Sequence, residues 1–251
     1  MSSSSDLQQQ DLVVFEDHSI VPRSSSEYHY LTLILFNSAT RPTWLVTALV
    51  ENSLFGTCYL NKSPISRRSS TPVVLASLNT AESTYRKQLA RLKGDLAEFK
   101  YVDLLSNYSN WFEMLSAQID QLAKKGKPNV FLENPEFLLF LSDTKVDTLL
   151  LQLQKLNAKC NLFLISSNDE SLLEYSEIPD DLATIHTSFL TKLVHRSNLL
   201  MSLRPLKTGR AVDVTGELTI CRGLIDSPQK VAEKEYLYLV NKEGTVKLFY
   251  R

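Results

Sequence analysis

Short runs of β-branched and aromatic residues alternate along the chain with longer stretches in which apolar residues recur at helical spacing. This alternation is typical of parallel strands joined by right-handed helical crossovers. We therefore expect an α/β fold built on a mostly parallel central sheet. The runs that predict strands are Leu31 to Phe36, Val73 to Ser77, Phe99 to Leu104, Val130 to Leu132 and Leu162 to Ile165.

Four helical stretches fill the gaps between these runs. A nearly continuous apolar stretch from Trp44 predicts a deeply packed first helix. Asn79, with Glu82 three residues later, predicts the start of the second helix, and Gly94 predicts its end. The apolar stripes of the later helices are Tyr85, Leu89 and Leu92, then Trp111, Leu115, Ile119 and Leu122, then Val146, Leu149, Leu150, Leu153 and Leu156.

From about Leu199 the apolar period changes to two, which is the period of a strand with one buried face. The alternation passes through Val212, Val214, Leu218 and Ile220, and two further runs, 236–240 and 246–250, flank a turn at 241–244. These features predict antiparallel hairpins at the C-terminal end. Because neither a linker nor an internal repeat interrupts the pattern, we expect one domain over residues 1–251.

Serine-rich segments punctuate the N-terminal half of the chain. They predict mobile stretches at residues 1–9, 23–27 and 61–71. The last of these contains Ser66-Arg67-Arg68-Ser69-Ser70, a pattern typical of basophilic kinase targets.

Composition narrows the classes of function. The chain has 27 basic and 28 acidic residues, so no global excess of positive charge indicates a nucleic-acid partner. Cys58, Cys160 and Cys221 form no CxxC pair, which argues against a metal site or a disulfide framework. The polar first residues lack a hydrophobic signal segment, and no apolar stretch is long enough to cross a bilayer. We expect a cytoplasmic or nuclear protein.

The first strand–turn–helix unit is where a nucleotide-binding α/β protein places its phosphate loop, GxxxxGK[ST]. Here the turn is Asn37-Ser38-Ala39-Thr40-Arg41-Pro42-Thr43, without glycine or lysine. All seven glycines of the chain lie at or after Gly56. A helix start without a triphosphate site, capped by Thr40, is the favoured interpretation.

The fourth predicted strand delivers Glu133 to the edge where NTPases hold magnesium or activate water. Without a phosphate loop this acid lacks the partners of a complete site, and Asn134-Pro135-Glu136 is equally typical of a turn into a helix. The four histidines form no metal-binding motif and are expected at the surface or in satisfied, partly buried positions.

Charge is segregated in the C-terminal half. Residues 160–191 contain six acidic and no basic residues, whereas 182–212 contain five basic and no acidic residues. The opposed stretches suit pairing within the fold, pairing between subunits, or a basic strip for a phosphate backbone. The candidate tRNA or intersubunit contacts are Lys192, Arg196, Arg204, Lys207 and Arg210.

Several runs carry a family resemblance across nearly the whole length. They are RPLKTGRAVDVTG (204–216), LTICRG (218–223), EYLYL (235–239), KLFYR (247–251), QDLVVF (10–15), and Trp44 with ALVE (48–51). Together they closely resemble the Elongator complex protein 6 family. The run at 204–216 is the most specific of them.

The resemblance implies a RecA-like ATPase fold that lacks the Walker signature. It also implies a place beside subunits four and five in a hetero-hexameric ring that binds tRNA and supports modification of the wobble uridine. Because that chemistry belongs to other Elongator subunits, the resemblance implies no catalytic residue, metal or cofactor of this chain, with ATP only at ring interfaces.

Two alternatives stay open on the residues themselves. One is an autonomous NTPase with an atypical phosphate site made of Arg41, Thr43 and Glu133. The other is a direct RNA-binding module that uses the five basic residues between 192 and 210.

Overall fold

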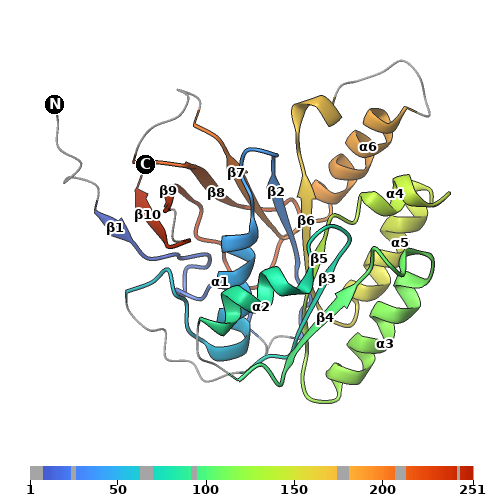
Figure 1. The fold of residues 1–251 in the computed structure, drawn as a ribbon, viewed down its shortest axis with the longest axis horizontal. Coiled ribbons are helices and arrows are strands. Elements are labelled where there is room, and N and C mark those ends of the chain that lie inside the picture. Colours follow the sequence, from blue (N-terminus) through green and yellow to red (C-terminus); the bar gives the residue numbers. More distant parts are fainter. Residues whose placement is uncertain are drawn as a thin grey trace.

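The computed structural model describes residues 8–23, 27–62, 70–91, 95–173, 181–206, 213–241 and 244–250. The described residues form one ten-stranded sheet in the order β1-β10-β9-β8-β7-β2-β6-β5-β3-β4 (Figure 1). The strands are β1 (Gln9–Gln10), β2 (Leu31–Phe36), β3 (Val73–Ser77), β4 (Phe99–Asp103), β5 (Asn129–Glu133), β6 (Asn161–Ser167), β7 (Leu199–Arg204), β8 (Gly216–Arg222), β9 (Lys234–Val240) and β10 (Val246–Tyr250).

The sheet is parallel on one side and antiparallel on the other. Every neighbouring pair from β4 to β7 is parallel, and every pair from β7 through β10 to β1 is antiparallel. This confirms the mostly parallel core and the C-terminal antiparallel strands. The prediction of antiparallel pairing from about Leu199 is wrong for one side of β7. This strand pairs in parallel with β2 and antiparallel with β8. A period of two marks one buried face and does not specify the direction of the neighbouring strand.

Helices cover both faces of the sheet (Figure 1). The apolar residues of α1 and α2 pack on one face with the N-terminal segment, and those of α3 to α6 pack on the other. α1 is buried almost all round, as predicted. The helices are α1 (Thr43–Phe55), α2 (Glu82–Ala90), α3 (Trp111–Ala123), α4 (Phe137–Leu141), α5 (Val146–Asn157) and α6 (Leu182–Val194), with 3-10 turns η1 (Tyr108–Asn110) and η2 (Glu170–Leu172).

Successive side chains of the central strands point to opposite faces of the sheet, so each strand contributes to the hydrophobic cores on both faces. In β2, Leu33 faces the side of α3 to α6, and Ile34 faces the side of α1. On the α1 side, Phe131 of β5 stacks on Phe163 of β6, with ring centroids 4.4 Å apart and planes 14° apart. These two residues are direct partners in the parallel register, so the strand pairing itself positions the stack.

The predicted start of the second helix is wrong. α2 begins at Glu82 after Ala81, without a side-chain cap. The hydroxyl of Ser77 instead accepts hydrogen bonds from the backbone N–H groups of Asn79 (3.1 Å) and Thr80 (2.8 Å) and holds them in the preceding turn. The predicted helix end at Gly94 lies outside the described residues, as does Leu92.

Two further expectations fall partly outside the described residues. Val214 lies outside the strands, and Val212 is not described. Of the segments predicted to be mobile, the structure describes only residues at their margins. Among these, Asn61 accepts a hydrogen bond from the backbone N–H of Leu12 (2.7 Å), and the N–H of Thr71 donates to the carbonyl of Ser53 (2.8 Å).

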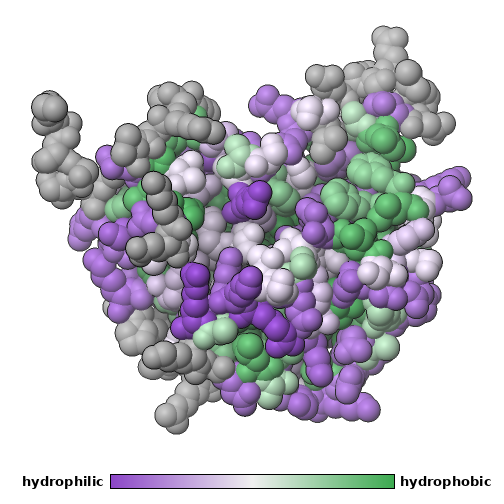
Figure 2. All heavy atoms as spheres, in the orientation of Figure 1, coloured by the Kyte–Doolittle hydropathy of each residue, from purple (hydrophilic) through white to green (hydrophobic). Residues whose placement is uncertain are grey.

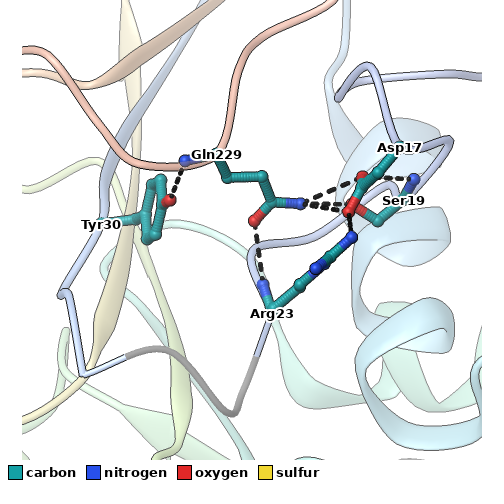
Figure 3. Close-up of polar contacts among 5 residues, drawn as sticks. All are labelled: Asp17, Ser19, Arg23, Tyr30 and Gln229. Atoms are coloured by element: carbon teal, nitrogen blue, oxygen red, sulfur yellow. Dashed lines mark hydrogen bonds and ion pairs between the residues drawn. The ribbon is translucent and has the colours of Figure 1, made fainter.

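A polar cluster fastens the N-terminal segment to the loop before β9 (Figure 3). The Asp17 carboxylate accepts hydrogen bonds from the Ser19 hydroxyl (2.6 Å) and the Gln229 amide (3.2 Å), and it pairs with Arg23. The backbone N–H of Gln229 donates to the Tyr30 hydroxyl (3.0 Å). Burial raises the pKa of Asp17, but the hydrogen bonds from Ser19, Gln229 and Arg23 outweigh it and lower the pKa to about 2.

We expect Asp17→Asn to lower the free energy of unfolding by about 1 kcal/mol at neutral pH, after allowance for solvent screening. Because the pKa of Asp17 is lower in the folded chain than in the unfolded chain, its carboxylate stabilises the fold fully at a pH above the unfolded-state pKa of about 3.9. This stabilisation is lost as the pH falls through the folded-state pKa of about 2. The deficit of the variant should therefore shrink between pH 4 and pH 2. Urea unfolding at several pH values measures it. A deficit independent of pH would contradict the assignment, and Asp120→Asn, at an exposed pair with Lys159, is the control.

Candidate functional site

The loop between β2 and α1 lies at the carboxyl edge of the sheet. Its backbone N–H groups donate hydrogen bonds to other residues of the same chain. The Ser38 N–H donates to the Asp169 carboxylate (2.9 Å), and the Ser38 hydroxyl donates to the same oxygen (3.1 Å). The N–H of Ala39 donates to the Asn37 side chain (3.1 Å), and that of Thr40 to the Asn37 carbonyl (2.9 Å). A phosphate-binding loop needs such amides free to face the ligand. These three are not free.

Thr40 ties this loop to the sheet and does not cap α1, which corrects the sequence prediction. Its hydroxyl donates toward the Asn37 side chain (2.8 Å) and the Leu203 carbonyl on β7 (3.2 Å). The residue before the helix is Pro42, without a side-chain capping bond. The backbone bond from Val46 N–H to the Pro42 carbonyl (3.0 Å) opens the helix. The amides of the first turn of α1 thus receive no capping side chain.

Glu133 ends β5 as a buried structural acid. Its side chain accepts hydrogen bonds from the hydroxyls of Ser77 (2.7 Å) and Tyr85 (3.1 Å), and the residue is 4% exposed. Burial raises the pKa of Glu133 above its ordinary value, although these hydrogen bonds act in the opposite direction. β6 lies between β5 and β2, so Glu133 is one strand away from the loop that carries Arg41 and Thr43.

A second buried acid at this edge, Glu136, was missed by sequence reasoning. It accepts hydrogen bonds from the Ser166 hydroxyl (2.8 Å), the Ser167 N–H (3.1 Å) and the Asn134 amide (3.0 Å). Burial raises its pKa. Asn134 has a φ of 57°, the left-handed conformation of a tight turn. The turn at 134–136 leads into α4, as the sequence indicated, and Glu136 also links it to the end of β6 by hydrogen bonds.

A cavity of about 640 Å³ opens beside the loop, between α1, α2 and the end of the β9–β10 hairpin. Arg41 and Thr43 line it, together with the aromatic residues Trp44, Tyr59 and Tyr238. Glu133 does not line it, so the three residues of the NTPase alternative do not share this cavity. No acidic residue stands among the described residues of its lining.

The described basic residues divide between the two edges of the sheet. Lys192 and Arg196 lie at the end of α6, which leads to the start of β7, and Arg204 lies at the far end of that strand. Lys192 pairs with Asp147 on α5 at 2.7 Å, so its partner is not in the acidic stretch. Lys207 and Arg210 lie outside the described residues, as do residues 66–69 of the kinase-type segment. The roles of these basic residues stay a prediction.

The histidines and cysteines show no catalytic arrangement where the chain is described. His186 is fully buried on α6, and neither ring nitrogen has a hydrogen-bond partner among the described residues, which corrects the expectation that the histidines are exposed or satisfied. Burial lowers its pKa. Cys58, Cys160 and Cys221 are free thiols. Within the described ranges, no cluster of metal ligands occurs and no helix is long and apolar enough to span a membrane.

No protein-family profile matches the chain. It is, however, 34% identical over 285 aligned residues to Elongator complex protein 6 of Saccharomyces cerevisiae, and the alignment covers 98% of this chain and 99% of the yeast protein. The chain belongs to the Elongator complex protein 6 family.

Membership of the Elongator complex protein 6 family confirms the resemblance seen in the sequence. It also agrees with the fold, which is RecA-like, with a mostly parallel central sheet extended by antiparallel strands. Within the motif at 204–223, Gly216 is sterically required, because an added Cβ would lie 2.6 Å from the Arg204 carbonyl oxygen and 2.7 Å from the Tyr238 hydroxyl. Residues 207–212 of the same motif are not described.

We expect Glu133→Gln to change stability and not nucleotide turnover. At neutral pH an amide turned toward Ser77 and Tyr85 loses an acceptor, at a cost of about 1–2 kcal/mol. The pKa of Glu133 is higher in the folded chain than in the unfolded chain, so its carboxyl stabilises the fold fully at a pH below the unfolded-state pKa. This stabilisation is lost as the pH rises through the folded-state pKa. The loss of stability caused by Glu133→Gln should therefore be largest in mild acid. Urea unfolding at pH 5 and pH 8 measures this.

Equilibrium dialysis with ATP on the same samples tests the other half of that prediction. Binding should be negligible for both forms of the isolated chain. Glu113→Gln, at an exposed position of α3, is the matched control and should shift stability by less than about 0.5 kcal/mol. ATP binding by the natural chain that Glu133→Gln abolishes would restore the NTPase alternative.

Proposed function

We propose that this chain is a non-catalytic structural subunit of the Elongator complex. One observation carries the proposal: the alignment with the yeast protein runs through nearly the full length of both chains. A match over nearly the full length of both chains suits a subunit with the same place in an assembly.

In this proposal the chain joins subunits four and five in a hetero-hexameric ring. The ring binds tRNA and supports modification of the wobble uridine, in the cytoplasm and the nucleus. The modification chemistry takes place on other subunits. ATP, where the assembly uses it, binds at interfaces that two chains share.

The geometry of the β2–α1 loop supports a non-catalytic role. Its amides donate to Asp169 and Asn37, and the acid at the end of β5 is sealed by Ser77 and Tyr85. A triphosphate with magnesium needs free amides, a lysine and an accessible carboxylate. The described residues of this edge do not bring these three features together, which favours a non-catalytic role.

Exposed apolar side chains support a role in assembly. Leu141 at the end of α4 and Leu182 at the start of α6 are 41% and 56% exposed. The half-buried Phe137, Phe140 and Ile185 lie in the same two helices. Figure 2 shows hydrophobic surface gathered over α4 and α6. Apolar patches of this kind mark interaction surfaces and make an isolated chain prone to aggregation.

Co-expression with subunits four and five, followed by native mass measurement, tests the proposal. We expect a heteromeric ring that contains this chain and gains mass on addition of tRNA. A stable monomer with no affinity for the two subunits would contradict it. Magnesium-dependent ATP hydrolysis by the isolated chain would favour the NTPase alternative instead.

Measurement of tRNA binding in the same experiment distinguishes binding by the assembled ring from direct binding by the basic residues of this chain. In that alternative, each phosphate that these side chains bind adds about one unit to the slope of the salt dependence. Neutralising Lys192, Arg196, Arg204, Lys207 and Arg210 would then flatten that slope and weaken tRNA binding. Unchanged affinity of the ring carrying these variants would exclude direct contact by the five residues and leave the assembly role intact.

A further inference from the structure

The cavity beside the β2–α1 loop is built from three parts of the chain that are distant in sequence. Its walls come mainly from the β2–α1 loop and the first turns of α1, from α2, and from β9 with the turn that follows it. Its volume of about 640 Å³ lies within the range of binding pockets and is much larger than a packing defect.

The charge of the lining is one-sided. Arg41 is exposed at its rim and forms no ion pair with a described residue. The described lining also includes the hydroxyls of several threonines, but no carboxylate. The uncapped amides of the first turn of α1, at Thr43 and Trp44, add positive potential at the same place. The cavity therefore complements an anionic group.

The inner wall has donors without acceptors. Trp44 and Tyr238 pack with ring centroids 5.0 Å apart and planes tilted by 42°. Both residues are more than nine-tenths buried, and the indole N–H and the phenol hydroxyl have no hydrogen-bond partner in the described structure. An indole N–H can only donate, so a group that satisfies it must bring an acceptor. Unsatisfied buried groups of this kind favour occupation of the site.

A carboxylate suits this cavity better than a polyphosphate. Several negative charges need several free amides, and those of Ser38, Ala39 and Thr40 are already used. One guanidinium with one or two neutral donors balances a single charge. The aromatic and aliphatic walls at Tyr59 and Val240 provide apolar contact for the remainder of a side chain or its neighbours.

We propose that this cavity receives an acidic peptide segment of a neighbouring subunit, with its carboxylate on Arg41 and its apolar part against Trp44, Tyr59 and Tyr238. The inference rests on the proposed place of the chain in an assembly. It identifies the α1–α2 face, beside the degenerate phosphate loop, as an interface between chains.

Charge reversal in the reconstituted assembly tests the inference. Arg41→Glu should weaken binding of this chain to its neighbours by about tenfold or more, because a charge pair becomes a like-charge contact. Ala39→Glu introduces an acid at the same exposed rim while Arg41 stays in place, and it should act in the same direction. Arg41→Lys should retain much of the affinity. Affinity is measured by titration of labelled chain into subunits four and five at two salt concentrations.

Lys155→Glu is the matched control, because Lys155 is an exposed base on α5, against the opposite face of the sheet. It should assemble as the natural chain does. Urea midpoints verify that all variants fold. Assembly of Arg41→Glu and Ala39→Glu with natural affinity would overturn the inference and leave the proposed function standing. Failure of the natural chain to assemble would overturn both.

A nucleotide in the cavity is the competing occupant. Fluorescence of Trp44, one of two tryptophans in the chain, reports on the site, and ATP and N-acetyl-aspartate are the probes. Saturable quenching by ATP that depends on Arg41 would overturn the inference in favour of a nucleotide site. No ATP response, together with the assembly defect, supports the peptide.

Discussion

The contact between the Asp169 carboxylate and Ser38 decides what the carboxyl edge of this sheet is able to do. One oxygen accepts both the N–H and the hydroxyl of Ser38, and the other accepts the Ser167 hydroxyl (3.0 Å). The position of β6 beside β2 makes this possible, because parallel neighbours bring their C-terminal ends to the same place. An internal carboxylate thus stands at amides that a phosphate loop would present to a ligand.

The other acids of this edge follow the same logic. Glu133 ties β5 to β3 and α2 through Ser77 and Tyr85, and Glu136 ties the turn after β5 to the end of β6. Each buried carboxyl is surrounded by donors, which offsets the cost of its desolvation. Their burial raises the pKa of both groups, and their positions suit structural links between strands better than exchange of protons or metal with solvent. The hydrogen bonds of the two acids thus link β5 with β3, α2 and β6 along the edge where ATPases place catalytic groups.

The hydrophobic pattern predicted most of the parallel core because core strands such as β3 contain consecutive apolar residues that become buried. It failed where polar groups decide the local structure. The Ser77 hydroxyl displaced the expected cap at Asn79, and the link from Thr40 to β7 displaced the expected cap of α1. The direction of β7 was missed because alternation does not specify parallel or antiparallel pairing. The absence of glycine at 37–43 predicts a loop without a triphosphate site, but no sequence pattern indicated that Asp169, more than a hundred residues away, accepts the Ser38 amide.

Two places for an anion therefore lie on either side of one short loop, and they differ in the source of the charge. At Ser38 the carboxylate belongs to the same chain, so the loop is ordered by folding, without the entropy cost of association. At Arg41 and Trp44 the described lining supplies donors and no carboxylate, so a charge that completes it has to come from another molecule. Asp169 therefore holds the loop through contacts within the chain. In the proposed contact between chains at the face beside the loop, Arg41 and the buried donors behind it provide the specificity.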